Sequence, residues 1–92
     1  MTELEMRAVG LAIRQLRIEA QKTLIESAKM CDNTKNWLVN IESGRRRLTF
    51  PDAKVLCEFY GVELNQLAEL TDKYEAKLNA NKNPSVDETE RA

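Results

Sequence analysis

One short segment of the sequence gathers polar side chains on one face of a predicted helix. In a helix with about 100° between successive residues, Leu38 and Ile41 point to one side. The opposite side carries Lys35, Asn36, Val39, Asn40 and Ser43. Lysine can donate hydrogen bonds to guanine, asparagine can make a paired contact with adenine, and valine can touch a thymine methyl. A merely solvated helix face more often carries Glu and Lys pairs, so this face predicts base reading in a major groove.

Three consecutive arginines, Arg45, Arg46 and Arg47, follow this segment directly. They lie where a duplex backbone would pass if the preceding helix entered the groove, although a solvated loop is the alternative interpretation. The whole chain carries a net charge of −1, but residues 14–47 carry +4 and residues 48–92 carry −4. A basic middle next to an acidic end favours a local polyanion-binding face, although charge alone also fits a solvated surface.

Apolar spacing and capping residues predict five helices and no strand, which is an all-α fold. Thr2 with Glu5 and Thr23 with Glu26 have capping-box spacing, and Thr34 can cap a third helix. The second and third helices are separated by a polar turn of three residues, which has the dimensions of a helix-turn-helix. We expect helices at about 3–20 and 24–31, from Thr34 to Gly44, from Thr49 to Gly61, and at 63–78.

Length and composition exclude several classes of protein. The 92 residues allow one small domain, and the chain has no histidine, which removes the usual general base and the commonest metal ligand. Cys31 and Cys57 have no ligand at metal-binding spacing, so we predict buried free thiols, no metal, no cofactor and no enzyme activity. The acidic first residues and a longest apolar stretch of only 8–13 predict a cytoplasmic protein without a membrane segment.

Residues 13–67 resemble the lambdoid-repressor-like, or Xre, helix-turn-helix family. The resemblance rests on Ile13-Arg14 with Leu16-Arg17, on Thr23 and Ala28, on Ile41-Glu42 with Gly44-Arg45, and on Gly61-Val62 with Leu64 and Leu67. It implies a five-helix domain, here with an extended C-terminal helix. It also implies a homodimer that binds a palindromic operator in double-stranded DNA and controls transcription, usually as a repressor.

The resemblance also implies roles for individual residues. Lys35, Asn36 and Asn40 would contact base edges, and we add Val39 for its methyl groups. The family buries an arginine of its first helix against a glutamate of its third helix. The resemblance therefore implies a structural ion pair between Arg17 and Glu42. Trp37 is predicted to lie in the core or at its edge, with an indole N–H that can reach a phosphate. The predicted phosphate contacts are Thr23, Trp37, Ser43, Arg45, Arg46 and Arg47.

In the last predicted helix, five residues recur at alternating spacings of three and four positions and form a seam along one side. This seam is longer than a small core needs. We interpret the seam as a dimer contact, with coverage of the helix bundle as the alternative. Its members are Leu64, Leu67, Thr71, Tyr74 and Leu78. We expect the domain to span residues 3–78, followed by a disordered acidic tail at 79–92.

A protein-interaction module, such as an antitoxin or adaptor with a protein partner, is the rival prediction. It is favoured by Leu24 and Asp32, where the family commonly has Gln and Gly.

Overall fold

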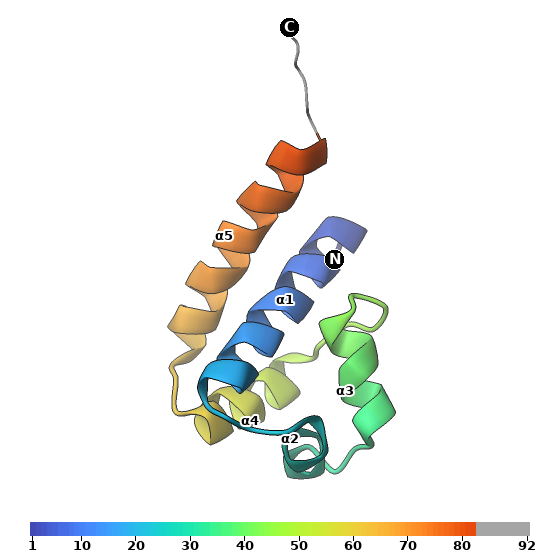
Figure 1. Ribbon diagram of the computed structural model, residues 1–92, viewed down its shortest axis with the longest axis vertical. Coiled ribbons are helices and arrows are strands. Elements are labelled where there is room, and N and C mark those ends of the chain that lie inside the picture. The colour runs from blue at the N-terminus through green and yellow to red at the C-terminus, as the bar shows by residue number, and fades with distance from the viewer. Residues whose placement is uncertain (83–92) are drawn as a thin grey trace, which may run out of the picture.

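The computed structural model describes residues 1–82, which form five α-helices and no strand (Figure 1). The all-α prediction is therefore confirmed. The last helix continues four residues past the predicted end at Leu78, so residues 79–82 are helical where a tail was expected. The rest of the predicted tail lies outside the described residues. The helices are α1 (Glu3–Glu19), α2 (Leu24–Met30), α3 (Lys35–Glu42), α4 (Phe50–Tyr60) and α5 (Leu64–Lys82).

Threonine residues cap the first four helices, as their positions in the sequence predict. Thr2 and Thr23 form full capping boxes, in which each hydroxyl accepts from the third helical amide and the glutamate at that position accepts from the threonine amide. The Thr34 and Thr49 hydroxyls accept from the amides of Trp37 and Asp52. These local bonds satisfy amides that would otherwise lack a partner at the start of each helix, and so they fix the helix boundaries.

Helix α1 is the central element, with α5 along one side and α3 along the other (Figure 1). The buried residues of α1 accordingly spread round more of the helix than one stripe. On α4, Ala53, Leu56, Cys57 and Tyr60 are buried, whereas Val55 and Phe59 are half-buried. Other large contributors to the core are Ile13, Leu16, Ala28, Trp37, Leu38, Ile41, Leu48 and Leu67.

Gly10 allows the backbones of α1 and α3 to approach closely. A Cβ atom built at this position would lie 2.3 Å from the carbonyl oxygen of Ile41 and 2.7 Å from that of Glu42. Both oxygens belong to backbone at the end of a helix, so neither can move away without shifting α3. Glycine weakens the helical pattern of α1 in the sequence. The packing of α1 on α3 nevertheless requires a glycine at this position.

We expect Gly10→Ala to lower the free energy of unfolding by about 1–3 kcal/mol, because the added methyl group forces α1 and α3 apart. Chemical denaturation measures this change. Exposed Ala76 of α5 supplies the control, where Ala76→Gly should cost about 0.5–1 kcal/mol through helix propensity alone. If Gly10→Ala instead stabilises the protein by that same amount, the close approach is wrong.

Candidate nucleic-acid interface

Helices α2 and α3 pack against one another across a tight connection that runs from Cys31 to Thr34. Asp32 in this connection adopts a left-handed conformation, with φ of 53°, as expected for the position where the related family commonly has glycine. Ser27, on the inner side of α2, is fully buried and its hydroxyl donates to the Thr23 carbonyl at 2.8 Å. Because its hydroxyl is hydrogen-bonded, Ser27 can be buried in the core at little cost in free energy.

Helix α3 presents one buried face and one accessible face. Leu38 and Ile41 are no more than 1% exposed and hold the helix against the core. On the opposite side, Lys35, Asn36 and Ser43 are exposed, and Val39 and Asn40 are half-buried. The structure therefore gathers the four predicted base-reading residues and the predicted phosphate contact Ser43 on one accessible surface, which we call the α3 face (Lys35, Asn36, Val39, Asn40 and Ser43).

Trp37 belongs to the core of the domain. It is 7% exposed and packs within the buried cluster, so its ring is not available for a nucleic acid to stack on. Among residues 1–82 the Tyr60 hydroxyl is the one buried side-chain nitrogen or oxygen without a hydrogen-bond partner, so the Trp37 indole nitrogen keeps contact with solvent. Only that N–H remains for the predicted phosphate contact.

The loop that follows α3 holds the three arginines in the open. The amides of Arg45 and Arg46 both donate to the Asn40 carbonyl, at 2.9 and 3.1 Å, which ties the loop to α3. Leu48 is buried and anchors the other end. All three arginine side chains are exposed between these anchors. Within the described residues the one ion pair is elsewhere, so no carboxylate neutralises them.

The structure adds a fourth arginine that the sequence did not indicate. Gly44, at φ of 82°, passes so close to α1 that a Cβ atom there would lie 2.7 Å from the Arg7 Cγ. Arg7 is exposed, and it contacts the start of the arginine loop at Gly44. We call Arg7 with Arg45, Arg46 and Arg47 the arginine cluster. No sequence signal marks Arg7, because its position depends on how α1 packs against the end of α3.

The amino end of α2 is less suited to holding a phosphate than the arginine cluster. Thr23 lines a shallow hollow with Lys22, Ile25 and Lys35, which brings a predicted phosphate contact next to a predicted base contact. The capping box, however, places the Glu26 carboxylate at this helix end. Hydrogen bonds from the Thr23 amide and hydroxyl lower the pKa of Glu26, so the carboxylate carries a negative charge at neutral pH.

The implied structural ion pair between Arg17 and Glu42 is present. Arg17 Nε and Nη2 donate to the two oxygens of Glu42 at 2.7 and 3.1 Å, and Nη1 donates to the Lys22 carbonyl at 3.0 Å. The side chains are only 13% and 8% exposed. Hydrogen bonding to Glu42 raises the pKa of Arg17. The pair therefore joins α1 to α3 and also fixes the loop that leads into α2.

Most of the predicted dimerisation seam contacts its own protomer. Leu67 is 7% exposed, and the Tyr74 hydroxyl is hydrogen-bonded to Gln15 of α1. The Thr71 hydroxyl donates to the Leu67 carbonyl at 2.7 Å. Leu64 also packs against the core, so coverage of the bundle, the alternative interpretation, accounts for Leu64, Leu67 and Tyr74, whereas Thr71 and Leu78 are half-buried. A dimer contact of the seam remains a prediction.

Both cysteines are free thiols in the structure. Burial raises the pKa of Cys57, and it raises the pKa of Cys31 to about 11, so both stay protonated at neutral pH. Cys57 is buried, whereas Cys31 is only half-buried at the end of α2. Across residues 1–82, no group of three metal-ligating side chains gathers in one place, and no helix is long and apolar enough to cross a membrane.

The fold and the accessible α3 face define a helix-turn-helix domain. Residues 8–70 match the family described as a helix-turn-helix domain, and the chain belongs to that family. Among solved structures, it is similar to the clp gene regulator ClgR from Corynebacterium glutamicum, with 23% sequence identity and a TM-score of 0.79. The similarity covers 86% of this chain and 83% of that one, and shows a shared fold. The comparison with curated proteins found no match.

We expect Glu42→Ala to lower the free energy of unfolding by about 3–5 kcal/mol, because it leaves the Arg17 guanidinium buried without its counter-charge. Urea denaturation followed by circular dichroism measures the loss. The double variant Arg17→Met with Glu42→Leu should recover most of that stability, since it removes both charges and keeps the volume. A double variant as unstable as Glu42→Ala would show that the charge pair is not the cause.

Proposed function

We propose that this protein is a sequence-specific, DNA-binding transcriptional regulator that acts as a homodimeric repressor on a palindromic operator. One observation carries the proposal: the exposed polar α3 face lies directly beside three exposed arginines that have no carboxylate partner among residues 1–82. Base-reading chemistry and phosphate-binding charge thus meet at one surface of the domain.

In this proposal, α3 enters the major groove of each half-site. Lys35 and Asn36 lie at its amino end and reach deepest, while Val39 and Asn40 contact the next bases along the groove. Arg45, Arg46 and Arg47 bind phosphates of the adjoining backbone and set the register. Two copies must present their α3 helices about 34 Å apart, one turn of the duplex, and so a palindromic site matches a twofold dimer.

The similar solved structure supports gene regulation. The family resemblance, together with the steric exclusion of other proteins from the operator, supports repression. ClgR, whose solved structure shares this fold, is a gene regulator. The resemblance to lambdoid repressors adds the direction of control, because a dimer seated on its operator keeps other proteins from the same stretch of major groove.

A protein-interaction module is the second candidate function. The observation that favours it is negative charge near the α3 face, from Glu26 at the amino end of α2 and from the exposed Asp32 in the turn. The arginine cluster favours DNA, since four exposed arginines lie beside the same face. The two functions differ in one simple result: the regulator binds duplex DNA as a purified chain without a second protein.

Salt dependence tests the phosphate contacts. If each protomer of a dimer uses its three loop arginines, about six phosphates are neutralised, and log K should fall against log salt with a slope of about −5. Arg46→Ala should make the slope shallower by about 2, because each dimer loses two contacts. Fluorescence anisotropy with a random duplex pool provides the measurement. Lys73→Ala, an exposed lysine of α5, should leave the slope unchanged, and an equal effect of both variants would remove the arginine loop from the interface.

Base reading is tested by selecting bound duplexes from the random pool and comparing the selected site with an unrelated duplex. Asn36→Ala should weaken binding to the selected site by about 1–3 kcal/mol and leave binding to the unrelated duplex almost unchanged. Asn79→Ala, an exposed asparagine far along α5, serves as the matched control. Equal losses on both duplexes would mean that Asn36 does not read bases.

A further inference from the structure

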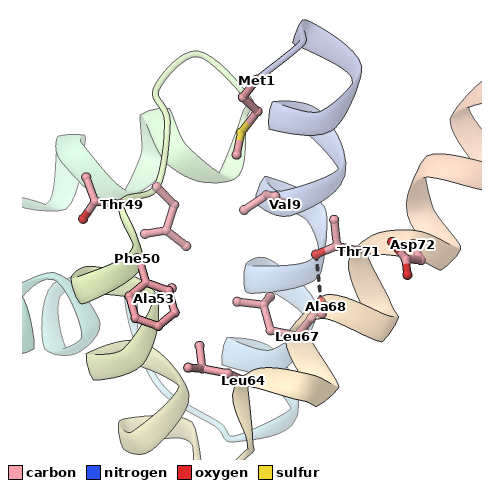
Figure 2. Close-up of a pocket in the computed structure, with 11 residues that line it drawn as sticks. Met1, Val9, Thr49, Phe50, Ala53, Leu64, Leu67, Ala68, Thr71 and Asp72 are labelled. Carbon is pink, nitrogen blue, oxygen red and sulfur yellow. Dashed lines mark hydrogen bonds between the residues drawn. The ribbon is translucent and has the colours of Figure 1, made fainter.

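An apolar hollow lies between α4 and α5, on a part of the surface that neither the α3 face nor the arginine cluster uses. It has a volume of about 500 Å³. Figure 2 shows Phe50 and Ala53 on the α4 side facing Leu64 and Leu67 of α5, with Val9 of α1 beyond them. Because nearly all of its lining is apolar, the hollow is a place where water is poorly held and an apolar group binds well.

The two most exposed large hydrophobic residues of the described chain lie at this hollow. Phe50 is 67% exposed and Met1 is 61% exposed, whereas Ile18, Ile25 and Met30, each about half-exposed, are not part of its lining. Single exposed apolar side chains are common, but an exposed aromatic ring beside an apolar hollow forms a continuous patch of the kind found at protein interfaces.

We infer that this hollow is the contact between two copies of the chain, in which the Phe50 ring of each copy enters the hollow of the other. The inference rests on the homodimer of the proposed function and assigns its interface. A twofold contact requires that one patch carry both the projecting group and its receptor. Phe50 and the hollow meet that requirement, since both belong to the same small area of one protomer.

The charges at this patch also complement one another across a twofold axis. The Lys54 ammonium lies 5.8 Å from the centre of the Phe50 ring, so it accompanies the projecting group. Asp72 lines the hollow on the α5 side. Within the described residues neither side chain forms an ion pair. When the ring of one copy enters the hollow of the other, Lys54 comes to the Asp72 carboxylate of that copy, and the exchange is reciprocal.

The assignment also gives part of the predicted α5 seam a role between copies. Leu64, Leu67 and Thr71 line the hollow, so an entering ring contacts them even though Leu67 is covered within its own protomer. Tyr74 and Leu78 lie outside the lining. The interface is therefore centred on the junction of α4 and α5 rather than on the far end of α5.

Sedimentation velocity of the full chain without DNA, over a dilution series, tests the inference. We expect a monomer–dimer equilibrium, and we expect Phe50→Ser to raise its dissociation constant about 100-fold or more, because the dimer loses two buried rings. Phe50 is exposed in the protomer, so this variant should fold normally, as circular dichroism will check. Met30→Ser is the matched control at a half-exposed apolar residue of α2, and it should leave the equilibrium unchanged.

Charge reversal gives a second, independent readout. Lys54→Glu and Asp72→Lys should each raise the dissociation constant about fivefold, because each change places like charges opposite one another in two positions. The two changes combined should return the constant close to that of the natural chain, since the attraction is restored with reversed signs. Additive losses in the combined variant would contradict the pairing of Lys54 with Asp72.

The outcomes separate this inference from the proposed function. A chain that stays monomeric throughout the dilution series overturns the inference, as does a dimer that Phe50→Ser leaves intact. The same variants are then titrated with duplex DNA. Dimerisation that depends on Phe50 in a protein that binds no DNA would support the interface and reject the DNA-binding proposal. Salt-dependent DNA binding by a stable monomer would do the reverse.

Discussion

The contact between α1 and the carboxyl end of α3 positions that helix end and the arginine loop that follows it. Gly10 brings the two backbones together at Ile41 and Glu42, and the Glu42 side chain then receives the Arg17 guanidinium. The two contacts are nearly two turns apart on α1 but meet α3 at the same end, so together they hold the carboxyl end of α3 against α1. The same contact sends the following loop past Arg7 at Gly44. A buried ion pair adds little net stability, but it makes other orientations of α3 costly.

Positive charge is distributed unequally along the candidate interface. The carboxyl side of α3 has the arginine cluster, which is exposed and not neutralised within the described residues. At the amino end of α2, where Thr23 is a predicted phosphate contact, the Glu26 carboxylate accepts from the Thr23 amide. Leu24 follows Thr23, where the related family commonly has Gln. The capping box that stabilises α2 thus opposes an anion at that end. If the domain binds DNA as proposed, the arginine cluster supplies most of the attraction to the backbone.

The sequence predicted local features well and long-range ones poorly. Thr2, Thr23, Thr34 and Thr49 each act on amides three residues away, so a short window of sequence contains all the information that sets those helix starts. The resemblance supplied the Arg17–Glu42 pair, which spacing alone cannot give. Spacing also could not decide whether the seam on α5 faces α1 or a second chain, because both contacts need the same apolar periodicity. The position of α1 explains the intramolecular contacts of Leu67 and Tyr74 and the place of Arg7, whereas the dimer contact of the seam stays a prediction.

The loop between α3 and α4 joins the two proposed surfaces of the molecule. Arg45, Arg46 and Arg47 precede Leu48, which is buried and lines the hollow, and Phe50 follows two residues later. This short connection is held at both ends, by the Asn40 carbonyl on α3 and by the Thr49 cap on α4. A ring from a second copy that settles beside Leu48 would therefore restrict the same segment that carries the arginines. Dimerisation would order the arginine segment in advance, which lowers the conformational entropy that the segment loses when it binds a duplex. Dimerisation and phosphate binding should therefore favour one another, independently of the two α3 helices entering the groove.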